Sequence, residues 1–431
     1  MHMSTSGAHV TPPPRAELAV AMASEFERMI GAVLDAGHRL HPDRLPLVVA
    51  EHAGRLGWRD VAVYVVDLSQ RLLVPLNADE LPRREPLEID STLAGRAFRN
   101  EQPIGGGVSR AADRSPATID LVEEDEEEAR RFWLPLIDGA ERLGVLAITL
   151  DRVDEATLER CRHLATVVAE LVVTKSAYGD GIVLARRLRE VDLAAELRWA
   201  MLPPLTFASE EVVISGILEP AYEIAGDSFD YAINGDTIEL AILDAMGHGL
   251  EASRMANLAV GSLRNSRRKH LDLHETTRVM DEVVAREFGP DRFLTGQLAT
   301  LKLSTGELQW LNAGHPAPLL LRGGQTADLT AEIRLPIGLT GERTQLATTA
   351  LEPHDAVLFF SDGVTEARAP DGELFGRARL ADLWVRASAS GATPAETMRR
   401  LCHAVLDHEA ASLRDDATLL LLQWLGRLPS V

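Results

Sequence analysis

The spacing of apolar residues divides the chain into two regions of different pattern. In the first, apolar residues recur at helical spacing over 25–53, and a strand-like run follows at 61–68. Two further apolar runs, 132–137 and 143–150, are joined by a polar turn, and a helical pattern begins at Glu155. This order predicts a mixed α/β domain that opens and closes with helices.

From about residue 207 onward, strand and helix patterns alternate. The expected strands span 212–218, 237–245, 297–303, 307–313, 317–322, 356–362 and 417–425. The expected helices span 250–269, 273–288 and 393–409. The turn sequences NGD (234–236) and STGE (304–307) favour antiparallel pairing of the strands beside them. This region is therefore expected to form two sheets with helices outside them.

Two segments lie outside these regions. Residues 1–22, which include a run of three prolines, are expected to be a disordered lead-in. Segment 178–204 predicts a helix that ends at Pro203. Its apolar stripe is Leu184, Leu188, Val191, Ala195 and Leu202, with Arg198 interrupting it. The stripe can form a homodimer seam or pack against the protein's own core, and the sequence leaves both interpretations open.

Composition narrows the protein class. A chain of 431 residues is too long for one ordinary core, so we expect at least two domains. The formal charge of -21 argues against nucleic acid or an anionic membrane as the main partner. No apolar run approaches the roughly 20 residues that cross a bilayer. Cys161 and Cys402 fall in separate predicted domains and indicate neither a disulfide framework nor a zinc site. We expect a soluble, cytoplasmic protein.

The six consecutive acidic residues at 123–128 lie in the connecting region of the first domain. Like charges repel, so the run is interpreted as a solvated loop rather than a surface for docking a partner.

Four aspartates in the second half carry the candidate chemistry. They are Asp227 in AGDSFD, Asp244 in DAMGHG, Asp362 in SDGVTEAR and Asp415 in RDDATLLLL. Each lies near an expected strand end, so their carboxylates can converge. Mutual repulsion would then raise their pKa values unless a cation lies among them, and hard divalent ions prefer such oxygen ligands. The alternative for any one of them is a turn aspartate that accepts backbone N–H bonds.

These four motifs, with NAGHPAP (312–318) and LPIGL (335–339), occur in the order that is found in PPM phosphatases, the metal-dependent protein serine/threonine phosphatases. The chain resembles their bacterial branch of sporulation and general-stress-response phosphatases. Ala225 replaces a glycine of the usual pattern, and Ser228 with Phe229 replaces a Phe-Tyr pair. The resemblance implies an α/β/β/α sandwich over residues 207–431, preceded by a helical linker over 177–206.

The resemblance also implies a ligand set for two ions, Mn²⁺ or Mg²⁺. Asp244 would bridge the ions and the backbone carbonyl of Ala245 would bind one of them. Asp227, Asp362 and Asp415 would complete the shell together with waters, and no Cys or Ser nucleophile is needed.

Several neighbouring residues keep two interpretations each. Asp230 and Asp416 can hold an outer-shell water or cap a turn. Glu366 falls where relatives place a carboxylate near a third ion, and His248 can act as a general acid, although its spacing from Asp244 differs from the usual motif. His315 is expected to shape its loop. The basic segment 264–270 ends a helix, where cations suit the helix dipole, or else grips a phosphoprotein.

Residues 23–176 resemble a GAF sensory domain. The resemblance depends on the words STLAGRAFRNEQPI (91–104) and WLPLIDGAERLGVLAITL (133–150). It implies regulation by an unknown small molecule or protein.

Together the two resemblances imply a phosphatase that acts on a phosphorylated anti-sigma-factor antagonist of the STAS type, in a partner-switching stress or developmental pathway. The GAF-like domain would gate it. Two alternatives are a non-catalytic signalling scaffold and a GAF-based ligand receptor with a phosphatase-like output domain. The presence of all four aspartates favours catalysis.

Overall fold

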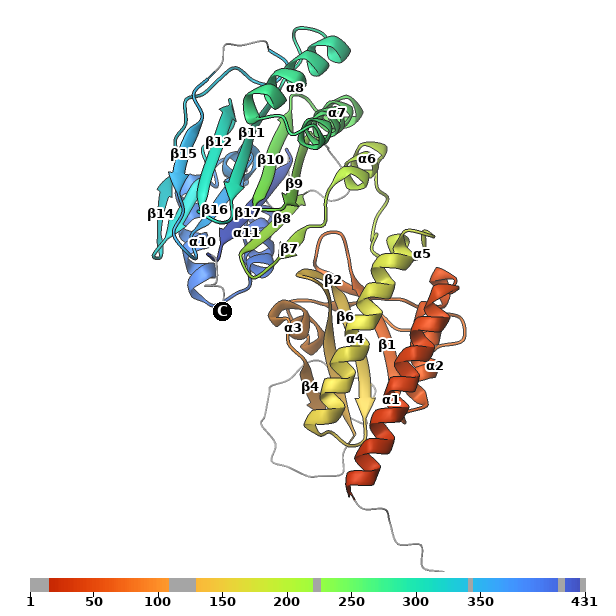
Figure 1. The fold of residues 1–431 in the computed structure, drawn as a ribbon. Helices are drawn as coiled ribbons and strands as arrows, with labels where there is room; N and C mark the ends of the chain where they lie inside the picture. Colours follow the sequence, from red (N-terminus) through yellow and green to blue (C-terminus); the bar gives the residue numbers. More distant parts are fainter. Residues whose placement is uncertain (1–14, 108–128, 220–225, 340–343, 410–414, 427–431) are drawn as a thin grey trace, which may run out of the picture.

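A computed structural model describes residues 15–107, 129–219, 226–339, 344–409 and 415–426. The chain forms an N-terminal domain and a C-terminal two-sheet sandwich, joined by short helices (Figure 1). The acidic run 123–128 and residues 1–14 of the expected lead-in lie outside the described residues. The first helix already begins at Arg15, within the segment that was expected to be lead-in. Among the described residues, no helix has both the length and the apolar character needed to cross a bilayer.

The N-terminal domain is built on one antiparallel sheet in the order β3-β2-β1-β6-β5-β4. Its strands are β1 (Arg59–Val66), β2 (Leu72–Pro75), β3 (Leu87–Glu88), β4 (Ile104–Gly107), β5 (Arg130–Asp138) and β6 (Glu141–Leu150). Its helices are α1 (Arg15–His38), a 3-10 turn (Pro42–Arg44), α2 (Leu45–Gly54), α3 (Leu93–Asn100) and α4 (Glu155–Ser176). The expected first strand, hairpin and closing helix are thus confirmed, and the 25–53 pattern corresponds to two helices.

The two faces of this sheet carry separate apolar clusters. On one face, Val33 of α1, Val49 of α2 and Leu164 of α4 pack with the inward side chains of β1, β5 and β6. On the other face, Phe98 of α3 and Ile89 pack with the alternate side chains of β1 and β6. Because alternate residues of a strand point to opposite faces, near-continuous apolar strands such as β1 are buried on both sides.

The C-terminal domain contains two antiparallel sheets. The first has the order β15-β12-β11-β10-β9 and the second the order β14-β13-β16-β17-β8-β7. The first sheet's strands are β9 (Asp227–Asn234), β10 (Thr237–Ala245), β11 (Leu294–Lys302), β12 (Glu307–Ala313) and β15 (Ala347–Ala350). The second sheet's strands are β7 (Thr206–Ala208), β8 (Val212–Glu219), β13 (Leu319–Arg322), β14 (Gln325–Asp328), β16 (Ala356–Phe360) and β17 (Ala417–Trp424).

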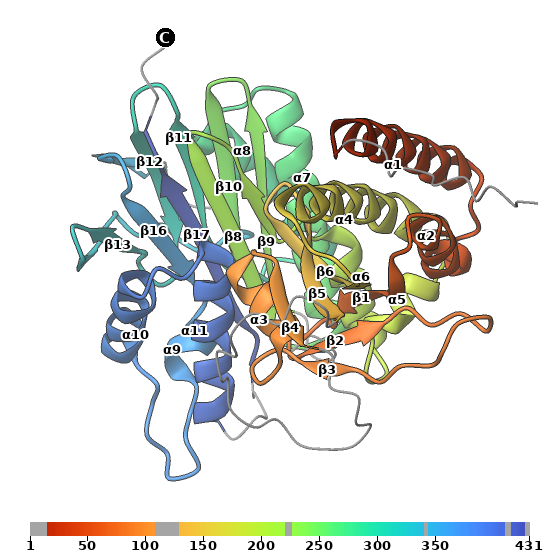
Figure 2. The ribbon, with the colours of Figure 1, turned by 90° about the horizontal axis from the view of Figure 1, so that it is seen from below.

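Helices cover the outer face of each sheet (Figures 1 and 2). They are α7 (Gly249–Arg268), α8 (Leu273–Phe288), α9 (Asp362–Glu366), α10 (Arg377–Ala389) and α11 (Pro394–His408). Side chains such as Phe229 and Phe359 fill the space between the sheets. Met255 of α7 and Met280 of α8 pack against the first sheet. Trp384 of α10 and the neighbouring side chains of α11 pack against the second sheet. The expected α/β/β/α arrangement is confirmed.

The sequence patterns missed several elements of this domain. They gave no strand for β7, β9, β14 or β15 and no helix for α9 or α10. β14 and β15 are short, largely polar edge strands, which carry little apolar periodicity. The first five residues of β9 are buried, but two of them are aspartates. These interrupt the apolar run that would have predicted a strand.

The expected continuous helix over 178–204 is wrong. The structure has two short helices instead, α5 (Gly181–Ala185) and α6 (Leu193–Met201). Asp192 starts the second one, because its side chain accepts the backbone N–H of Ala195 at 2.7 Å as an N-cap. The expected stripe therefore does not lie along one helix, and Leu184 and Leu188 are exposed. A dimer seam through this segment stays a prediction, without a continuous apolar face to support it.

Polar contacts join the N-terminal domain to α11 of the sandwich. Arg142 on β6 donates to Glu396 on α11 at 3.0 Å, and both side chains are buried. Arg399 of α11 donates to Asp90 at 2.5 Å, and the ring Nε2 of His403 lies 3.0 Å from the carbonyl oxygen of Ser69. The N-terminal domain is therefore in direct polar contact with the domain that holds the four aspartates.

Candidate active site

Asp227 and Asp244 lie opposite each other on adjacent strands of the first sheet. Asp227 is the first residue of β9, Asp244 is near the end of β10, and the two are paired in the antiparallel register. Directly opposed residues on such strands have Cβ atoms about 4.5–5.5 Å apart. Gly226 permits this approach, because a Cβ there would lie 2.9 Å from the Ala245 carbonyl oxygen. The antiparallel register therefore places Asp227 and Asp244 side by side.

Asp362 and Asp415 come from adjacent strands of the second sheet. Asp362 follows β16, and Asp415 precedes β17 by two residues. The two segments are tied by Ser361, whose N–H donates to the Thr418 carbonyl at 3.0 Å and whose Oγ accepts the Thr418 N–H at 3.0 Å. A Cβ on Gly363 would lie 2.0 Å from the Asp416 carbonyl oxygen, so only glycine fits at this crossing.

Asp416 and Thr418 join the two pairs across the sheets. The Thr418 hydroxyl donates to Asp227 at 2.6 Å. One oxygen of Asp416 accepts the backbone N–H groups of Gly226 and Asp227 at 2.6 and 3.0 Å, and the Asp416 N–H donates to Asp415 at 2.9 Å. Four chain segments from two sheets therefore meet at one place. Sequence reasoning left Asp416 open, and its contacts are those of a residue that fixes the backbone of its neighbours.

The carboxylates of this cluster raise one another's pKa values. Burial, followed by the charges of Asp362 and Asp415, raises the pKa of Asp244 to about 7. Burial and the charge of Asp244 raise the pKa of Asp227 well above its usual range. Burial and the nearby Asp362 also raise the pKa of Asp415. Since these shifts arise from burial and from clustered negative charge, a cation bound among the carboxylates would stabilise their charged forms.

Hard divalent cations fit this donor set. Every side chain in it offers carboxylate oxygen, and the Ala245 carbonyl lies against the same glycine as Asp244. In the part of the chain that the structure describes, no three His, Cys, Asp or Glu side chains form a ready-made metal-binding group. Ions held here therefore need backbone carbonyl or water oxygens beside the carboxylates, as Mg²⁺ commonly does.

The remaining predicted residues fall around the cluster in different ways. Asp230 is fully engaged by α7, because it accepts from Arg264 at 2.7 Å and from Arg267 at 2.9 Å. These contacts also account for two cations of the basic segment 264–270. His248 is exposed at the start of α7, and Glu366 is exposed at the end of α9.

His315 shapes its loop, as expected. Its Nδ1 lies 2.9 Å from the Thr295 hydroxyl, and the Asn312 side chain bonds both its N–H and its carbonyl at 2.8 and 2.9 Å. Burial lowers the pKa of His315 to about 3, so the ring is neutral at physiological pH.

Arg198 is the residue that sequence reasoning did not connect to the site. It lies on α6, outside the sandwich, and its Nη1 donates to Asp416 at 3.1 Å with both side chains buried. The signal was the single arginine that interrupts the apolar stripe of the linker. Nothing in the sequence indicated its partner, which is 218 residues away.

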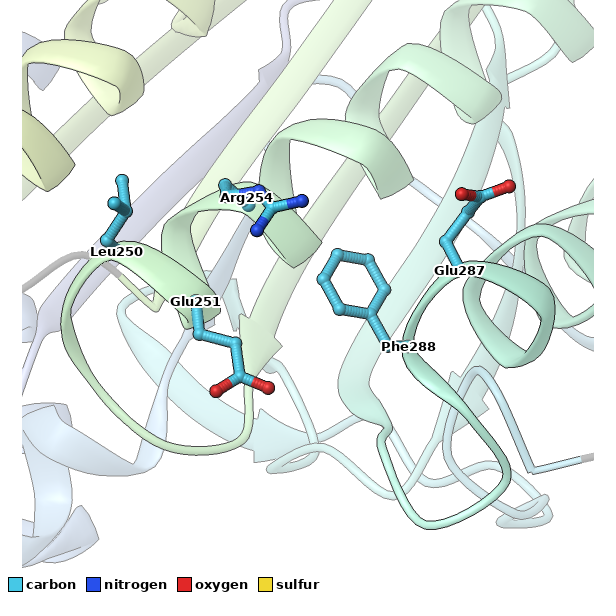
Figure 3. A pocket seen from close by; sticks show the side chains of 5 residues that line it. All are labelled: Leu250, Glu251, Arg254, Glu287 and Phe288. Atoms are coloured by element: carbon cyan, nitrogen blue, oxygen red, sulfur yellow. The ribbon is translucent and has the colours of Figure 1, made fainter.

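A surface hollow of about 450 Å³ lies between α7 and α8 (Figure 3). Its walls are Leu250, Glu251 and Arg254 of α7 with Glu287 and Phe288 of α8. The first of these helices begins directly after the DAMGHG loop that carries Asp244. The hollow itself contains none of the four aspartates.

Comparison with known proteins matches residues 234–425 to the family described as stage II sporulation protein E (SpoIIE). The phosphoserine phosphatase RsbU of Bacillus subtilis is 23% identical over 236 residues, which cover 54% of this chain and 70% of RsbU. Protein IcfG of Synechocystis sp. is 22% identical over 261 residues, covering 54% of this chain and 41% of IcfG.

Among solved structures, the RsbU and RsbW domains of a Mycobacterium tuberculosis protein share 27% identity and a TM-score of 0.43, covering 51% of this chain and 61% of theirs. The family match covers Asp244, Asp362 and Asp415, and the relative RsbU is a phosphatase by name. Residues 234–425 therefore form a PPM-type protein phosphatase domain of the SpoIIE and RsbU kind.

Proposed function

We propose that this phosphatase uses two divalent ions, Mn²⁺ or Mg²⁺, to hydrolyse phosphoserine or phosphothreonine in a protein. Asp244 would bridge the ions, the Ala245 carbonyl would bind one, and Asp227, Asp362 and Asp415 would complete the shell with waters. The observation that carries this proposal is the meeting of four acidic segments from two sheets, with raised pKa values for Asp227, Asp244 and Asp415.

The chain's own groups hold the site in shape. Gly226 and Gly363 allow the loops to approach, while Ser361 and Thr418 tie the second sheet to Asp227. When bound, divalent ions lower the pKa of a coordinated water and offset the negative charge of the phosphoryl oxygens. The carboxylates would orient that water without being consumed, so no covalent phosphoenzyme is needed.

The proposed substrate is a phosphorylated anti-sigma-factor antagonist of the STAS type. The relative RsbU is named a phosphoserine phosphatase, which supports phosphoserine as the group that is hydrolysed. We further propose that the GAF-like domain, over residues 23–176, regulates the phosphatase in response to a small molecule or a protein. The buried Arg142–Glu396 pair, which joins the two domains, supports such coupling.

Phosphate release tests the catalytic proposal. The full chain is assayed with an aryl phosphate and with a phosphoserine STAS protein, in Mn²⁺ and in EDTA. Activity is expected only with Mn²⁺, and Asp362→Ala is expected to abolish it. Asp371→Ala is a matched control, because Asp371 is exposed and its side chain accepts only a local backbone N–H, that of Glu373. Equal rates in Mn²⁺, in EDTA and for Asp362→Ala would remove the proposal.

A further inference from the structure

One buried arginine of the linker contacts the acidic cluster directly. Arg198 is 1% exposed although its helix, α6, lies between the two domains. Its guanidinium donates to one carboxylate oxygen of Asp416 at 3.1 Å. A buried guanidinium is stable only when a carboxylate and hydrogen bonds compensate for its lost hydration. This contact therefore fixes the orientation of the Asp416 side chain.

Asp416 passes this orientation on to Asp227. Its second carboxylate oxygen accepts the backbone N–H groups of Gly226 and Asp227. Its contact with Asp415 is made by the backbone N–H of Asp416 and does not depend on the orientation of the side chain. The backbone at the start of β9 is thus held by a carboxylate whose other side is held by the linker. In the described part of the chain, no salt bridge engages Asp227, Asp244, Asp362 or Asp415 themselves.

The position of Arg198 in turn depends on how α6 is seated. Helix α7 holds α6 through three polar contacts that reach its backbone carbonyls. The Ser253 hydroxyl donates to Ala194 at 2.9 Å, and the Asn257 amide donates to Leu197 at 3.1 Å. At the far end, Arg264 donates to the Met201 carbonyl at 2.6 Å. Figure 1 shows the resulting placement of α6 beside α7.

We infer that Arg198 is a positioning residue of the phosphatase: through Asp416 it holds Asp227 in place, so that the acidic site is competent for divalent ions only while α6 is seated. This inference depends on the proposed metal-dependent function. Removal of a partner that orients a metal ligand commonly costs about 10–100-fold in metal affinity.

Electrostatics and positioning predict opposite changes in Mn²⁺ affinity when Arg198 is replaced. Arg198→Met removes a positive charge beside the site. The loss of Coulomb repulsion between the guanidinium and Mn²⁺ would by itself make Mn²⁺ bind more tightly. Loss of positioning makes Mn²⁺ bind more weakly. The sign of the change in affinity therefore separates the two roles.

The experiment is calorimetric titration of the metal-free full chain with Mn²⁺, without substrate, and circular dichroism to verify folding. Arg198→Met is expected to weaken Mn²⁺ binding about 10–100-fold, and Arg198→Lys to recover part of it. In the assay, saturating Mn²⁺ is expected to restore much of the kcat of Arg198→Met. The control is Arg187→Met, which removes an arginine that pairs with the half-exposed Glu196 of the same helix and is expected to leave Mn²⁺ affinity unchanged.

Unchanged or tighter Mn²⁺ binding by folded Arg198→Met overturns the inference, and so does an equal loss for Arg187→Met. If Arg198→Met does not fold, Arg198→Gln, which keeps a donor without the charge, decides by the same criterion. If the wild-type chain does not bind Mn²⁺, the proposed function fails. Wild-type binding with no effect of either Arg198 variant defeats only the inference.

Discussion

Glu396→Gln is expected to destabilise the folded protein strongly, although Glu396 lies outside the active site. The Glu396 carboxylate is 1% exposed and accepts from Arg142 at 3.0 Å, from Arg399 at 2.9 Å and from Arg400 at 2.9 Å. Burial alone would raise the pKa of Glu396, but the hydrogen bond and charge of Arg399, with the charge of Arg142, outweigh it and leave the pKa below its usual value. The charged carboxylate is therefore required in the folded protein.

The loss of stability depends on the partners that each of the three arginines retains in the variant. Arg400 is 43% exposed and can be solvated, and Arg399 keeps its pair with Asp90. Arg142 is 4% exposed, and its hydrogen bond to Gln70 at 3.2 Å and its contact with the Phe98 ring supply no negative charge in place of the Glu396 carboxylate. Leaving one buried partner of an ion pair without its counter-charge costs about 3–5 kcal/mol of stability.

Urea unfolding of the full chain measures this free energy. Because Arg142 and Glu396 belong to different domains, Glu396→Gln is also expected to separate their unfolding into two transitions. Asp382→Asn is the control, since it breaks an exposed i,i+4 pair with Arg386 and is expected to cost about 0.3–0.5 kcal/mol. The double variant Arg142→Met/Glu396→Gln is expected to lose less unfolding free energy than the two single variants lose together. Additivity within about 0.5 kcal/mol would refute the reasoning.

Three further predictions concern other parts of the chain. Gly363→Ala places a Cβ 2.0 Å from the Asp416 carbonyl oxygen, so we expect a loss of about 1–3 kcal/mol and weaker Mn²⁺ binding, and wild-type values for both would contradict this packing. His315 has a folded pKa of about 3 against 6.5 unfolded. Below pH 6.5 the unfolded state therefore binds more protons, and the free energy of unfolding decreases as the pH is lowered. Relative to His315→Gln, the wild type should lose about 2 kcal/mol between pH 7 and pH 5 in urea titrations, and a constant difference would be evidence against a neutral buried ring. Burial raises the pKa of the Cys161 thiol to about 12 and that of Cys402 well above its usual value, so Ellman's reagent should react with both only after unfolding, and rapid reaction of the native protein would disprove their burial.

The sequence alone determined the class of the sandwich and the four segments of the site. Strands such as β10 and β17 are buried apolar runs, and their periodicity is a local property of the chain. The aspartates could be found because each lies beside glycine or a second aspartate in a short motif next to an apolar run. Short polar edge strands lacked such a signal, and their formation depends on pairing with a neighbouring strand.

Only the tertiary structure decided how the linker and the domain contact are built. The apolar stripe of 178–204 favoured one helix, but the N-cap at Asp192 and the contacts of Arg186 with the N-terminal sheet divide it into two. The partner of Arg198 is 218 residues distant, and the partner of Arg142 is 254 residues distant. Sequence patterns report the environment of a side chain through its near neighbours. The pairing of two buried charges is fixed by the packing of whole domains, so it could be read only from the folded chain.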